Sequence, residues 1–207
     1  MKDTKLVFRD LEDSLNELKL SRKSPVNVRR QFGRFLTLTQ QLTGMMRKEC
    51  ERLTGYKWGA SEFGEWNSVT DLFKKLRRTD YHESPVVINV RESQHFLVNT
   101  YKDEFGEEYG GYLTFQVTWG LGDPFASDIS SDLTPIFFGK NKESIEDIKP
   151  DIVDYEFILD PRTDEIKKAL ELACSDDVHV LSEKCFEILE KYYQFYQDRV
   201  KELMKRK

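Results

Sequence analysis

The feature that most constrains the fold is a long apolar stripe at helical spacing between Asn27 and Thr54. Apolar or weakly polar side chains recur there every three or four residues over about six turns. These side chains are Phe32, Phe35, Leu36, Thr39, Leu42, Met46, Cys50 and Leu53. Gly55, which accepts the left-handed conformation of a helix C-cap, ends the pattern. One amphipathic helix cannot bury its own stripe, so the chain is predicted to form a helical bundle.

Helical patterning recurs on both sides of this segment. Ser68 and Asp71 predict an N-cap and an acidic first turn. Asp160 and Pro161 predict a cap followed by proline at the first helical position. The predicted helices are residues 4–20, 27–54, 68–79, 161–173 and 177–205. Their apolar faces predict a shared core of Phe35, Leu36, Leu42, Met46, Leu72, Phe73, Leu76, Leu181, Ile188, Leu189 and Tyr192.

The period of the pattern changes to two in the middle of the chain. Residues 112–119 alternate, and residues 85–92 and 94–101 are rich in Val, Ile, Phe and Tyr, so these three segments are predicted strands. The acidic segment 103–108 supplies a turn. Two further stretches are predicted to be loops, residues 120–140 because of their glycine and proline breakers and residues 142–160 because of their acidic composition.

The predicted fold class is therefore α+β and mainly α, a helical bundle with an inserted small antiparallel β-sheet. A chain of 207 residues is long enough to bury a sizeable core. We expect residues 1–207 to form a single domain, with the helical bundle from 1–82 and 161–207 and the β/loop insertion at 85–160.

The charge of the chain is unevenly distributed. The net charge is −5, but residues 1–100 have an excess of five positive charges and residues 101–207 an excess of ten negative ones. The basic half can present a nucleic-acid-binding face, whereas the alternative is a set of unrelated solvated faces.

Composition also bears on the compartment. No apolar run approaches the length of a membrane span, and the first residues lack the apolar region of a signal peptide. Cys50 and Cys185 fall on apolar helical faces, which favours reduced thiols in the core. We expect a cytoplasmic protein that does not bind membranes.

One stretch, residues 68–85, combines a helix end with an arginine and a histidine. Arg77 and His82 would be about 140° apart on a continuous helix and could not share a site. Asp80 would fall on the apolar face of such a helix, so the helix is predicted to end near Thr79. The break would let Arg77 and His82 converge. The basic and aromatic side chains beside them are Lys74, Arg78 and Tyr81.

The Arg77-x-x-x-x-His82 spacing at a helix end, within a helical chain, resembles the HEPN family (higher eukaryote and prokaryote nucleotide-binding domains). That family usually has Asn, Asp or His after the arginine, where this chain has Arg78. The resemblance covers roughly residues 4–82 and 177–207. It implies a metal-independent ribonuclease of a toxin or antiviral defence system, an RNA partner, and a homodimer that brings two motifs together.

The chemistry of this pair is consistent with RNA cleavage without a cofactor or metal. His82 would be the acid/base that takes or gives the proton of the 2′-hydroxyl. Arg77 would hold the phosphate and stabilise its added charge. Arg78, Tyr81 and Lys74 would bind substrate. In the alternative, Arg77 and His82 are structural, and the protein is a non-catalytic helical interaction protein that binds a protein partner through its sheet and acidic loop.

Other candidate residues have structural interpretations. Trp58, Phe63 and Trp66 are predicted to pack under neighbouring helices, with base stacking as the alternative. His95 is predicted on a sheet face and His179 on the surface of a first helical turn. Asp151 and Asp154 lack a histidine or a spaced ligand set nearby, so a solvated surface is favoured over a metal site.

Overall fold

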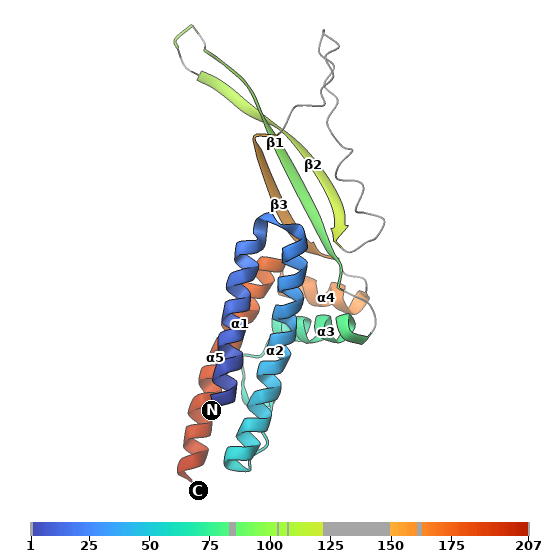
Figure 1. The fold of residues 1–207 in the computed structure, drawn as a ribbon. Coiled ribbons are helices and arrows are strands. Elements are labelled where there is room, and N and C mark those ends of the chain that lie inside the picture. The colour runs from blue at the N-terminus through green and yellow to red at the C-terminus, as the bar shows by residue number, and fades with distance from the viewer. Residues whose placement is uncertain are drawn as a thin grey trace. The chain divides into compact units, whose positions relative to one another are not determined.

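A computed structural model describes residues 2–82, 86–102, 104–106, 108–121, 150–160 and 163–206. The chain groups into two compact units, of which the first is Met1–Val87 with Leu159–Lys207 and the second is Ile88–Ile158. We call them the helical unit and the sheet unit and describe each by itself. The observed class is α+β and mainly α, which confirms the predicted fold class (Figure 1).

The helical unit contains five described α-helices and two short 3₁₀ turns. Its elements are α1 (Lys2–Leu20), η1 (Ser21–Lys23), α2 (Pro25–Thr54), η2 (Ala60–Glu62), α3 (Ser68–His82), α4 (Asp164–Ala173) and α5 (Val178–Lys205). The long helices α1, α2 and α5 pack side by side (Figure 1). The shorter helix α3 contacts α2, α4 and α5, so it lies where three helices meet.

The helix ends follow local hydrogen-bonding chemistry. Gly55 ends α2 with a φ of 75°, a left-handed conformation that glycine adopts without strain. Two predicted N-caps are wrong. The Asn67 side chain, and not Ser68, accepts hydrogen bonds at the start of α3, from the backbone of Val69 and Thr70. Thr163 caps α4 by accepting from Ile166, so the helix begins after Asp160, and Pro161 lies outside the described residues.

The core of the helical unit is close to the predicted one. Ten of the eleven predicted core side chains are buried, and Ile188 is half-buried. Cys50 and Cys185 are buried free thiols, as predicted. The surface position predicted for His179 is wrong, because its side chain is buried and its Nε2 lies 3.2 Å from the backbone oxygen of Leu18. Burial lowers the pKa of His179 and so favours the neutral imidazole.

The sheet unit is a three-stranded sheet in the order β2-β1-β3. Its strands are β1 (Ile88–Lys102), β2 (Glu108–Leu121) and β3 (Ile152–Leu159). The strands β1 and β2 form an antiparallel hairpin in which Phe96 lies opposite Leu113, with an irregularity between Val98 and Tyr101. The two strands predicted at 85–92 and 94–101 are one continuous strand.

The strand β3 corrects the prediction that residues 142–160 form a loop. In Ile152–Leu159 the side chains on one face become progressively buried toward Phe157 and Leu159, while Asp154 and Glu156 face solvent. These acidic residues occupy the outward positions of a period-two pattern. They make the segment acidic on average, so its strand pattern was not recognised. The rest of that prediction, residues 142–149, and most of the predicted 120–140 loop lie outside the described residues.

Candidate functional site

The helix α3 is helical as far as His82, so the predicted break near Thr79 is wrong. On one helix the directions of residues 77 and 82 differ by about 140°, whereas those of residues 78 and 82 differ by about 40°. Arg78, therefore, is the arginine that shares a helix face with position 82. The side chains of Tyr81 and His82 lie outside the described residues.

The other predicted site residues on α3 differ in their surroundings. Arg77 is half-buried, and Arg78 is exposed. Lys74, which the sequence predicts to bind substrate, is exposed and lines a hollow in the helical unit. Among the described residues, therefore, a predicted binding residue, Lys74, lies in this hollow and not at the end of α3.

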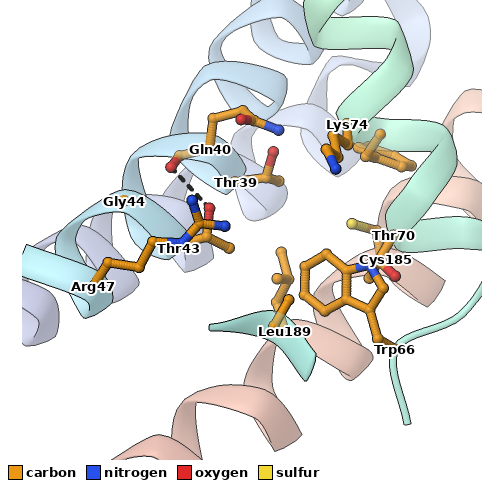
Figure 2. A pocket seen from close by; sticks show the side chains of 12 residues that line it. Thr39, Gln40, Thr43, Gly44, Arg47, Trp66, Thr70, Lys74, Cys185 and Leu189 are labelled. Carbon is orange, nitrogen blue, oxygen red and sulfur yellow. Dashed lines mark hydrogen bonds between the residues drawn. The ribbon is translucent and has the colours of Figure 1, made fainter. Parts of the chain in front are cut away.

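The hollow has a volume of about 210 Å³ and lies among α2, α3, α5 and the segment that precedes α3. Figure 2 shows Arg47 reaching from α2 and Lys74 from α3 toward the same space, with the Trp66 indole facing α2 across it. The full lining is Thr39, Gln40, Thr43, Gly44, Arg47, Ala60, Trp66, Thr70, Phe73, Lys74, Cys185 and Leu189.

The described lining of the hollow is positively charged. None of its twelve described lining residues is acidic. Arg47 and Lys74 are exposed, and neither has an ion-pair partner among the residues that the structure describes. Their neighbours differ, because Lys75 pairs with Glu165 at 3.1 Å and Arg52 pairs with Asp3 at 3.3 Å. Two exposed cations beside one concave surface attract an anion.

The indole of Trp66 is held in place at the side of the hollow. Its Nε1 donates to Asp71 Oδ1 at 3.1 Å, and its ring meets the ring of Tyr192 edge-on, with centroids 5.4 Å apart. Trp66 is half-buried, and it lines the hollow with part of its ring surface. Trp58 and Phe63 are buried against α5, as predicted, so Trp66 alone of these three ring systems lines the hollow.

The floor of the hollow is mainly apolar. Phe73, Cys185 and Leu189 line it and are buried. Burial raises the pKa of the Cys185 thiol, so the sulfur stays protonated at neutral pH and adds no negative charge. The hollow therefore combines an apolar floor, one aromatic wall and a cationic mouth.

Three polar residues of the sheet unit that the sequence analysis considered, His95, Asp151 and Asp154, make structural contacts. His95 bridges strands, with Nδ1 2.9 Å from Thr114 Oγ1 and Nε2 3.4 Å from Asp154 Oδ2. Asp151 accepts a hydrogen bond from the backbone of Leu97. These contacts agree with the predicted sheet-face position of His95. Within the described ranges, no group of three or more His, Cys, Asp or Glu side chains could hold a metal ion.

Arg47 is a candidate site residue that the sequence prediction missed, and Trp66 entered it only through the alternative of base stacking. A pattern for them exists, since Gln40, Thr43, Gly44 and Arg47 follow an i, i+3, i+4, i+7 spacing beside the apolar stripe of α2. On α3, Thr70, Phe73 and Lys74 continue the same kind of stripe. What the pattern lacks is any indication that these two stripes face each other.

Comparisons with protein-family models, with curated proteins and with solved structures gave no match. The HEPN resemblance therefore stays a prediction that depends on the residues around Arg77 and His82. Among the described residues, no helix is long and apolar enough to span a membrane.

Proposed function

We propose that this protein binds single-stranded RNA through its helical unit, at the hollow between α2 and α3. The observation that carries the proposal is the placement of Arg47 and Lys74, both without an ion-pair partner among the described residues, beside the half-buried indole of Trp66. Cations hold phosphates and an indole stacks on a base, so the combination suits a nucleic-acid strand. The HEPN resemblance favours RNA over DNA.

The parts of the hollow differ in what they would contribute. A base stacked on an aromatic side chain stabilises a complex by about 1–3 kcal/mol. Each cation that neutralises a phosphate adds affinity that falls as salt concentration rises, because counterions are released from the strand. Arg47 can contact two phosphate oxygens through its planar guanidinium, whereas Lys74 acts as a point charge.

The test is fluorescence anisotropy with a labelled single-stranded RNA of mixed sequence at several salt concentrations. Lys74→Ala and Arg47→Ala should each weaken binding and lower the salt slope by about one. Lys75→Ala and Lys48→Ala are matched controls, because each removes a neighbouring cation that does not line the hollow. Equal losses in all four variants would indicate non-specific attraction and contradict the proposal.

A second candidate function is metal-independent cleavage of the bound RNA. The observation behind it is that α3 is helical as far as His82, which puts Arg78 and position 82 on one helix face. His82 is the acid/base in this proposal. Arg78, which lies on the same helix face as position 82, takes the role of phosphate clamp within one chain. Arg77 would reach the same phosphate from a second copy in a homodimer. Such a protein would work in the cytoplasm, as a toxin or defence ribonuclease.

Cleavage is measured on the same RNA in the presence of EDTA. His82→Ala should abolish it, and Arg78→Ala should lower it more than Arg77→Ala if one chain supplies the site. The reverse order, together with a dimer in size-exclusion chromatography with light scattering, would assign the site to two copies. RNA binding without cleavage would indicate a non-catalytic RNA-binding protein. The absence of both would favour the interaction protein that binds a partner through the sheet unit.

A further inference from the structure

We propose that the hollow holds a single nucleotide, with its base against Trp66 and its phosphate beside Arg47 and Lys74, and that it prefers a base that carries an exocyclic amino group. This inference deepens the proposed RNA binding and rests on it. It concerns which part of a strand enters the hollow and which chemical group is selected there.

The size of the hollow and its floor argue for one nucleotide. Its volume of about 210 Å³ is below the range of about 300–1,000 Å³ that is usual for drug-sized ligands. Buried Phe73, Cys185 and Leu189 form its floor, so we expect a strand to enter and leave by the same mouth. One nucleotide, either free or turned out of a strand, can enter through the mouth, where both cations are exposed.

The direction of insertion follows from polarity. The apolar floor and the Trp66 ring suit a flat base, whereas a phosphate placed there would lose its hydration without gaining a cation. Arg47 and Lys74 are exposed, so a phosphate beside them keeps part of its water. The base therefore points inward and the phosphate outward.

The preference for an amino group follows from three threonines in the lining. Their hydroxyl groups donate to backbone oxygens of their own segments: Thr39 to Leu36 at 2.8 Å, Thr43 to Gln40 at 3.0 Å and Thr70 to Asn67 at 2.8 Å. A hydroxyl whose hydrogen is already donated can only accept from a ligand. Thr70 also accepts from the backbone of Asn67, so among the three threonines Thr39 and Thr43 are the acceptors that a ligand can use.

Such a wall distinguishes cytosine from uracil. Cytosine has an amino donor at the ring position where uracil has a carbonyl oxygen. A carbonyl oxygen that faced the Thr39 and Thr43 oxygens would meet only acceptors, and one hydrogen bond would be lost. The expected difference in affinity is about threefold to tenfold in favour of cytosine.

The test uses the full chain and two matched probes, CMP and UMP, followed by the indole N–H signals in NMR spectra. The chain has three tryptophans, and Trp66→Phe identifies the signal of Trp66. CMP should shift that signal, with about threefold to tenfold tighter binding than UMP. Thr43→Val, alone or with Thr39→Val, should remove the difference, because valine keeps the shape and lacks the acceptor.

Arg47→Ala and Lys74→Ala should weaken CMP binding, and cytidine, which lacks the phosphate, should bind more weakly than CMP. The inference is overturned if UMP binds as tightly as CMP, or if inorganic phosphate binds as well as CMP, which would mean an anion site only. If RNA affinity falls in Arg47→Ala and Lys74→Ala while CMP leaves the Trp66 signal unmoved, RNA binding stands and the single-nucleotide inference fails. If RNA does not bind at all, both proposals fail.

Discussion

Two regions of the helical unit differ in the surroundings of their charged side chains. The first surrounds Glu49, a buried carboxylate on α2 that accepts hydrogen bonds from Thr4 and from Tyr196 at 3.2 Å and lies 3.6 Å from Arg52. The second is the hollow, where the exposed Arg47 on the same helix has no acidic residue beside it in the described lining. The two residues are two positions apart in the sequence and on different faces of the helix.

This difference separates charges that stabilise the fold from charges that are available for a ligand. A buried carboxylate is tolerated only when its partners replace water. Although burial raises the pKa of Glu49, the hydrogen bonds from Thr4 and Tyr196 are among the contacts that lower it on balance, so the carboxylate stays ionised. An exposed cation without an ion-pair partner keeps its water, and it can exchange that water for a phosphate at little cost to stability.

The largest effect is expected in the apolar floor of the hollow. Leu189 on α5 is buried at the floor of the hollow, and Leu189→Ala should lower the free energy of unfolding by about 2–5 kcal/mol. Urea denaturation measures the loss. Leu172→Ala is the matched control, since Leu172 is 71% exposed and its truncation should cost less than about 0.5 kcal/mol.

Glu49→Gln should have the next largest effect. Glutamine keeps the shape of the side chain and loses the charge, so the hydroxyls of Thr4 and Tyr196 lose a strong acceptor, at a cost of about 1–3 kcal/mol. The matched control is Glu51→Gln, because Glu51 is exposed on the same helix. If both variants unfold at the same urea concentration as the wild type, Glu49 does not have the structural role assigned to it here.

The pH dependence of stability tests the same carboxylate. The folded-state pKa of Glu49 lies below its ordinary value of 4.5, so its contribution is present above pH 4.5 and is lost as pH falls through the folded pKa. The folded-state pKa of His179 is also lowered, from 6.5, so protonation begins to favour unfolding below that pH. Thermal unfolding from pH 7 to pH 3 should show a shallower decline below pH 4.5 for Glu49→Gln than for the wild type.

The smallest effect on stability is expected in the hollow. Arg47→Ala and Lys74→Ala should each change the free energy of unfolding by less than about 0.5 kcal/mol, because neither has an ion-pair partner among the described residues to lose. Thermal unfolding of the variants used for RNA binding measures this change. A decrease of more than about 1 kcal/mol in the free energy of unfolding would mean that Arg47 and Lys74 stabilise the fold, as Glu49 does, and would contradict the contrast between the two regions.

The sequence by itself determined much of the fold. Apolar spacing alone predicted α2, and the Gly55 that ends it, because one helix face must be buried whatever packs against it. It did not predict β3, where Asp154 and Glu156 occupy outward positions, since this strand is held by pairing with β1, which lies far from it in the sequence. The burial of His179 was missed for a similar reason, because the Leu18 backbone oxygen that it contacts belongs to a distant helix.

Only the tertiary structure decided which residues make up the site. Lys74 was predicted from its place beside Arg77, a local property of the sequence. Its position opposite Arg47 and Trp66 depends on how α3 packs against α2 and α5, and those contacts join residues far apart in the chain. The periodicity of a helix fixes which side chains share its face, but the partner that this face meets is set by the packing of the whole unit.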